Sequence, residues 1–67
     1  MGLKELRTKR NLSQNELGKI SGVSWRTIQN YEQGIKDINK AKGETLYKLS
    51  KALKCKVEDL LVKDNIM

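Results

Sequence analysis

The sequence contains no histidine and only one cysteine, Cys55. Without an imidazole there is no histidine base, no histidine metal ligand and no cysteine–histidine nucleophile pair. No glycine-rich loop precedes a lysine and a serine or threonine, as nucleotide phosphate binding requires. We therefore expect no enzyme activity, no metal and no cofactor. One cysteine cannot form an internal disulfide, which suits a reducing compartment, and we expect Cys55 to be a small packing residue.

Proline is absent as well, glycine occurs only five times, and long apolar runs are missing. The longest aliphatic run, Leu60-Leu61-Val62, is far too short to cross a membrane. No apolar segment of signal-peptide length follows the first residues, so we expect a cytoplasmic protein. Alternation of apolar and polar residues never persists as it does in strands. With little to interrupt helices, the sequence predicts an all-α fold.

Basic residues outnumber acidic ones by 14 to 8, which gives a formal net charge of +6 and a sequence pI of about 9.7. Their even spread along the chain argues against a disordered basic tail. This balance favours a polyanionic partner over an acidic protein or a neutral ligand. At 67 residues the chain is expected to form one small domain over residues 1–67, with a marginal core. Close helix packing, aided by a second subunit, must then supply stability.

Residues 13–34 carry the strongest local signals in the chain. Ser13 stands three residues before Glu16, which is the spacing of a capping box at a helix start. Leu17 and Ile20 follow as a short apolar stripe at helical spacing. The segment therefore predicts one helix of about two turns, and the residues after it predict a second.

Gly22 ends the first of these helices, and Ser24 is the expected N-cap of the second. Gly34 ends the second helix, because glycine adopts the left-handed C′ conformation without a steric penalty. At 100° per residue, Ile28 and Tyr31 fall on the face that would pack inward. Two helices joined by a short glycine-containing turn are typical of helix-turn-helix units.

The opposite face of the second helix is polar and contains no acid. It carries a guanidinium and three carboxamides, from Arg26, Gln29, Asn30 and Gln33. Arginine matches the hydrogen-bonding edge of guanine, and asparagine or glutamine matches adenine. Such an arc can also be an ordinary solvated helix face. The paired-helix frame favours a surface that binds DNA bases.

Periodicity and capping signals predict three further helices, at residues 2–10, 40–53 and 57–61. Asn11 is the expected break after the 2–10 helix, and Asn39 is the expected N-cap of the 40–53 helix. Gly43 lies inside the 40–53 helix, where it should cost about 1 kcal/mol relative to alanine. We expect it to permit the close approach of a neighbouring helix. Residues 62–67 would form a C-terminal tail.

An ordered series of short motifs runs through residues 3–61. Its members are Leu6-Arg7, Leu12-Ser13-Gln14, Glu16-Leu17, Ser21-Gly22-Val23-Ser24, Thr27-Ile28, Tyr31-Glu32, Gly34, Thr45-Leu46, Leu49, Ala52-Leu53 and Val57-Glu58-Asp59-Leu60-Leu61. In this order the series resembles the Cro-type (XRE-type, lambda-repressor-like) helix-turn-helix family of DNA-binding domains. The resemblance implies a compact bundle of about five short helices with the helix-turn-helix at helices two and three. It also implies a sequence-specific transcriptional regulator of double-stranded DNA, expected to be a repressor.

In such a domain the helix at residues 24–33 enters the major groove of DNA. The expected base contacts come from Ser24, Trp25, Arg26, Thr27, Gln29 and Asn30. The expected phosphate contacts come from Arg10, Gln14, Gln33, Lys36 and Lys40. Family members pair an arginine with a glutamate at the positions of Arg7 and Glu32, which ties the first helix to the third. Direct phosphate contact by Arg7 is the alternative.

Trp25 is the least family-like residue of the motif. It can touch thymine methyls, sugars or a phosphate edge, because the indole N–H donates hydrogen bonds. It can equally cover the core near Val23. The sequence leaves both interpretations open.

One helix-turn-helix unit contacts few base pairs, so we expect a homodimer on a near-palindromic operator in a cytoplasmic, nucleoid-associated setting. Half-sites would lie about 34–36 Å apart. The apolar residues available for the symmetric contact are Val57, Leu61, Val62, Ile66 and Met67. One alternative is an antitoxin-like interaction module whose main partner is a protein, such as a toxin or an antirepressor. Another is a general nucleic-acid binder without sequence preference.

Overall fold

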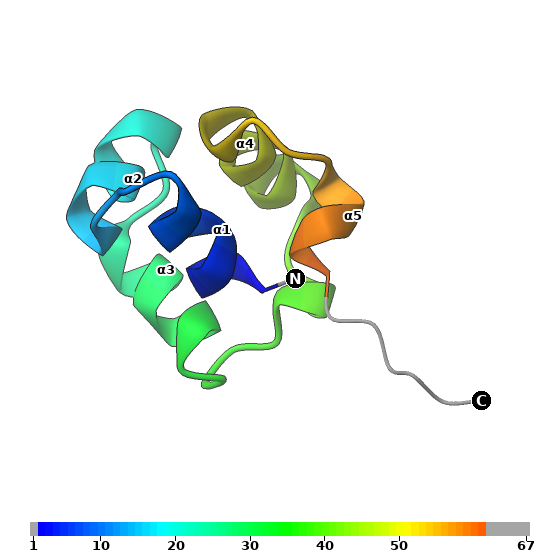
Figure 1. Ribbon diagram of the computed structural model, residues 1–67. Coiled ribbons are helices and arrows are strands. Elements are labelled where there is room, and N and C mark those ends of the chain that lie inside the picture. Colours follow the sequence, from blue (N-terminus) through cyan, green and yellow to red (C-terminus); the bar gives the residue numbers. More distant parts are fainter. Residues whose placement is uncertain (1, 62–67) are drawn as a thin grey trace.

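The chain folds as a series of short helices joined by tight turns (Figure 1). The computed structural model describes residues 2–61, and within that range it contains helices and turns but no strand, as the sequence predicts. Figure 1 shows α1, α2 and α3 on one side of the bundle and α4 and α5 on the other. In chain order the elements are α1 (Leu3–Lys9), α2 (Gln14–Ser21), α3 (Trp25–Glu32), the 3₁₀ turn η1 (Ile38–Lys40), α4 (Gly43–Leu53) and α5 (Val57–Leu60).

Side-chain caps start the two central helices where the sequence predicts. The Ser13 hydroxyl accepts a hydrogen bond of 3.0 Å from the Glu16 amide, and the Glu16 carboxylate accepts one of 2.8 Å from the Ser13 amide. This capping box satisfies two amides that a helix start leaves without partners. At α3 the Ser24 hydroxyl accepts a hydrogen bond of 3.2 Å from the Arg26 amide. The backbone direction of both helices is therefore fixed locally.

Two glycines make the turns that follow these helices. Gly22, after α2, and Gly34, after α3, both have φ of +78°, a conformation that side chains with a Cβ rarely adopt. After Gly34 the amides of Ile35 and Lys36 both donate to the Asn30 carbonyl, at 2.9 and 3.2 Å. These bonds close the end of α3 and direct the chain toward η1.

The core is aliphatic and draws on every α-helix. α2 contacts both α3 and α4, while α5 packs on α4. Burying one such side chain contributes roughly 1.5–3 kcal/mol. The largest fully buried side chains are Leu17, Ile28, Leu49, Leu53 and Leu60.

The predicted start of the helix at residues 40–53 is wrong. Residues 38–40 form η1, the Asp37 carboxylate accepts a 3.0 Å hydrogen bond from the Asn39 amide, and Ala41 is extended. Burial of Ile38 draws this segment into the core, so the α-helix begins only at Gly43. A Cβ built on Gly43 would meet no heavy atom within 4 Å, so the expected close approach there is wrong as well.

α2 buries a different stripe from the one that its sequence suggests. Leu17 and Ser21 face the interior, whereas Ile20 is 60% exposed. The close approach in this region is at Gly18, where a Cβ would lie 3.0 Å from the Val23 carbonyl oxygen and 3.2 Å from the Trp25 nitrogen. α2 and the start of α3 are therefore nearly in backbone contact.

Candidate nucleic-acid interface

The outer face of α3 presents side chains that the fold does not use. Arg26 and Gln33 are exposed, and Gln29 and Asn30 are partly exposed. Within residues 2–61, the carboxamides of Gln29, Asn30 and Gln33 make no hydrogen bond to another residue. Ile28, on the opposite face, is fully buried. Donors and acceptors therefore project from a helix whose other side is fixed in the core.

A cluster centred on Glu32 fixes the inner edge of α3. Its carboxylate accepts two hydrogen bonds from Arg7 of α1, at 2.7 Å from Nε and 3.0 Å from Nη2. Gln14 of α2 donates a third through Nε2, at 3.0 Å. Arg7 also donates through Nη1 to the Leu12 carbonyl, at 2.8 Å. The cluster thus links three helices, and the side chains of Arg7 and Glu32 are only 12% and 3% exposed.

Both members of the Arg7–Glu32 pair stay charged. Burial raises the pKa of Glu32, but hydrogen bonds from Arg7 and Gln14 and the positive charges of Arg7 and Lys4 outweigh it, so the net pKa is lowered. The hydrogen bond to Glu32 raises the pKa of Arg7 despite partial burial. Gln14 is an expected phosphate ligand, but one of the two N–H donors of its side-chain amide is already engaged by Glu32.

Arg10, another expected phosphate ligand, is engaged elsewhere. Its Nε donates to the Leu53 carbonyl at 3.0 Å, and its Nη2 donates to the Lys54 carbonyl at 3.4 Å. Because these carbonyls belong to the end of α4, Arg10 caps that helix and joins it to the end of α1. With two of its nitrogen atoms engaged in this cap, Arg10 is not expected to contact a phosphate.

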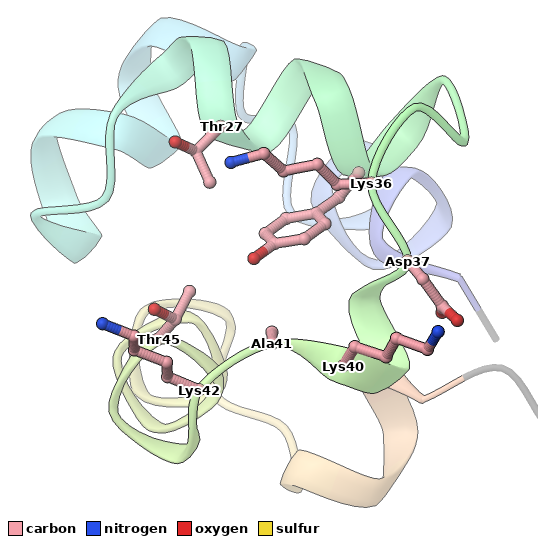
Figure 2. A pocket seen from close by; sticks show the side chains of 8 residues that line it. Thr27, Lys36, Asp37, Lys40, Ala41, Lys42 and Thr45 are labelled. Atoms are coloured by element: carbon pink, nitrogen blue, oxygen red, sulfur yellow. The ribbon is translucent and has the colours of Figure 1, made fainter.

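A basic cleft of about 480 Å³ lies between α3 and the segment leading into α4. Figure 2 shows Lys36 extending below α3 toward Thr27, with Lys42 and Thr45 on the facing wall. The full lining is Thr27, Tyr31, Lys36, Asp37, Lys40, Ala41, Lys42 and Thr45. Of these lining residues, Lys36 and Lys40 belong to the predicted phosphate contacts, whereas Lys42 and Thr45 do not. Placing the helix start at Gly43 would have shown that Lys42 stands at its N-cap.

The first turn of α4 borders this cleft through Lys42 and Thr45 and also carries the acidic residue Glu44. Its N-cap is Lys42, and no side chain caps the helix start. The free amides and the helix dipole both favour an anion at such an end. Three lysines and one aspartate line the hollow, and Figure 2 shows Lys36 reaching across it while Lys40 extends toward Asp37. The excess of positive charge suits a phosphate group of a polyanion.

Trp25 is the first residue of α3 and lies on the surface. Its side chain is not buried in the core, since the residue is 43% exposed. The Arg26 guanidinium carbon lies 5.4 Å from the centroid of its ring. A shallow hollow of about 260 Å³ adjoins it, lined also by Gly18, Lys19 and Gly22.

The expected dimer residues fall into two groups. Val57 is 36% exposed, whereas Leu61 packs against the core. Val62, Ile66 and Met67 lie outside the described residues.

Cys55 also packs against the core, and burial raises the pKa of its thiol, with a further increase from Asp59.

In residues 2–61, no three histidine, cysteine or acidic side chains are grouped so that they could hold a metal ion. None of the helices described here is long and apolar enough to span a membrane.

A family model described as helix-turn-helix matches residues 3–60, from the first residue of α1 to the last of α5. No curated protein and no solved structure matches the chain significantly.

Proposed function

Because the chain belongs to the XRE-type helix-turn-helix family of DNA-binding regulators, we propose that it represses transcription by binding a specific duplex sequence through α3. The unused hydrogen-bonding face of α3 is the observation that carries this proposal. Arg26, Gln29 and Asn30 would contact base edges in the major groove. Ser24 and Thr27 would lie at the margin of that contact. A protein bound at an operator can block transcription by its presence alone, so repression requires no additional protein-binding surface.

The phosphate contacts are proposed to flank α3. On one side, Lys36 and Lys40 of the basic cleft would hold a backbone phosphate, with Lys42 beside them. On the other side, Gln14 stands at the first position of α2 and has one donor left for a phosphate. Contacts of this kind fix the register of the protein on DNA without reading its sequence.

Selection of bound sequences from a random duplex pool tests the proposal directly. We expect enrichment of one short motif, arranged as a near-palindrome. Equal binding to all sequences would instead support a general nucleic-acid binder. Failure to bind any duplex, together with stoichiometric co-purification of a partner protein, would support the antitoxin-like alternative.

The palindrome follows from a proposed homodimer, because one α3 reaches too few bases for operator specificity. Half-sites would lie about 34–36 Å apart, one turn of the double helix. Val57 is the described candidate that remains exposed for such a contact. Sedimentation with and without the selected duplex should show two chains per operator. A single chain per full operator would contradict the dimer.

Replacing Lys36 with alanine is expected to weaken binding to all duplexes alike and to reduce the slope of log K against log salt by about 1, because a phosphate contact carries no sequence information. Lys51→Ala is the matched control, since it removes the same charge from an exposed site near the end of α4. Affinity measured over a salt series distinguishes Lys36→Ala from Lys51→Ala. A loss confined to the selected operator, with an unchanged salt slope, would show that Lys36 reads sequence.

A further inference from the structure

Trp25 and Arg26 are in contact although they are consecutive residues of a helix. Successive side chains of a helix point about 100° apart and do not normally face each other. Here the guanidinium carbon of Arg26 lies 5.4 Å from the centre of the indole ring, within the range of a cation–π contact. Long helical side chains lean toward the N-terminus, which brings Arg26 back over Trp25. Its charged group is therefore held toward the start of α3.

The backbone that carries the indole ring is fixed by its surroundings. Gly18 of α2 leaves so little room that a Cβ there would lie 3.2 Å from the Trp25 nitrogen and 3.5 Å from its Cα. The Ser24 cap fixes the same segment through the Arg26 amide. The residue stays 43% exposed. Trp25 thus offers a flat surface on a rigid support, at the edge of the outer face of α3.

A guanidinium held near a ring keeps the N–H donors that point away from that ring. These donors lie in the plane of the group and point outward. Arg26 can therefore rest on Trp25 and still donate two parallel hydrogen bonds to the O6 and N7 atoms of a guanine. The contact also restricts the side chain before DNA arrives, so less freedom is lost on binding.

We propose that Trp25 is a positioning residue that acts through Arg26, holding its guanidinium ready for a guanine in the major groove and reading no base itself. This inference rests on the proposed function, since it concerns how α3 distinguishes one base pair. It predicts a guanine in each half-site whose recognition depends on both residues.

A double-mutant cycle tests the proposal. Binding of the wild type, Trp25→Leu, Arg26→Ala and the double variant is measured on the selected operator and on one with that guanine replaced. Trp25→Leu should weaken operator binding about two- to fivefold, because the freed Arg26 side chain must then be ordered when DNA binds, and it should reduce the preference for guanine. It should have no effect in the Arg26→Ala background. Trp25→Phe should restore part of the affinity, because its ring keeps a π face.

The same loss from Trp25→Leu in both backgrounds would overturn the proposal, because it would mean that the indole touches DNA directly. Thermal unfolding should give similar midpoints for all four proteins, since neither residue is buried in the core. An operator preference with additive losses would refute the positioning role alone. Absence of any preferred sequence in the wild type would refute both this role and the proposed function.

Fluorescence of the free protein provides an independent readout, because Trp25 is the only tryptophan in the chain. Arg26→Ala should change the emission intensity or maximum, since it removes a cation from the ring. Lys51→Ala, which removes an equal charge from the far end of α4, should leave the emission unchanged. Identical spectra for the wild type and Arg26→Ala would show that the two side chains do not stack in solution, which would also overturn the proposal.

Discussion

Replacing Glu32 with glutamine is expected to lower the free energy of unfolding by about 3 kcal/mol, because it leaves the Arg7 guanidinium buried without a counter-charge. Glu32 and Arg7 are only 3% and 12% exposed in their side chains, so solvent screens the pair weakly. A domain of this length is stable by roughly 3–10 kcal/mol in total. The variant should therefore unfold at a markedly lower temperature or urea concentration, as followed by circular dichroism.

The control is Glu44→Gln, which breaks the exposed pair between Glu44 and Lys48 at 3.5 Å on α4. A surface pair at this helical spacing contributes at most about 0.5 kcal/mol. The two variants remove the same charge, so their difference isolates burial. If Glu32→Gln were as heat-stable as Glu44→Gln, the cluster would not hold α3 in place.

The same carboxylate gives the fold an acid-sensitive contribution. The folded-state pKa of Glu32 is lowered, because hydrogen bonds and positive charges outweigh the opposing effect of burial. Its contribution to stability is therefore complete above the ordinary carboxyl pKa and is lost as pH falls through the lowered value. In Glu32→Gln this part of the acid dependence should disappear, which unfolding measured over a pH series would show.

Replacing Arg26 with alanine is expected to reduce operator affinity by about 1–3 kcal/mol and to relax the preference at one base pair of each half-site. The proposed bidentate contact to guanine would be lost, whereas the fold would be unaffected because Arg26 is exposed and its bond to the Ser24 cap is made by the backbone amide. Repeating the selection with the variant identifies the position that loses its preference.

Lys36→Ala is the natural comparison for this result, since both changes remove one positive charge. Arg26→Ala should cost much more on the operator than on random duplex, and Lys36→Ala should cost the same on both. Equal losses on operator and random DNA for both variants would refute the division between base-reading and phosphate-binding residues.

The start and end of α3 could be predicted from the sequence because they depend on neighbouring residues. Ser24 accepts a hydrogen bond from an amide two residues later, and Gly34 provides the positive φ that the turn needs. The all-helical fold follows likewise from local periodicity together with the absence of proline. The polar arc opposite Ile28 is equally evident from residue spacing alone.

Features that depend on contacts between distant segments could not be predicted in the same way. Burial of Ile38 replaced the expected first turn of the fourth helix with η1 and an extended residue. Arg10 caps the end of α4, a contact across more than forty positions of the chain. The basic cleft also needed the fold, because its two walls come from α3 and from the start of α4.

The separation of the two faces of α3 has a consequence for how such a protein changes over generations. Gln29, Asn30 and Gln33 contribute no side-chain hydrogen bond to the part of the fold described here, whereas Ile28 and Glu32 hold the helix in place. Mutations can therefore accumulate on the outer side without unfolding the domain. Under the proposed function, a duplicated copy of such a gene would be able to change its operator through this face of α3 while keeping the same scaffold.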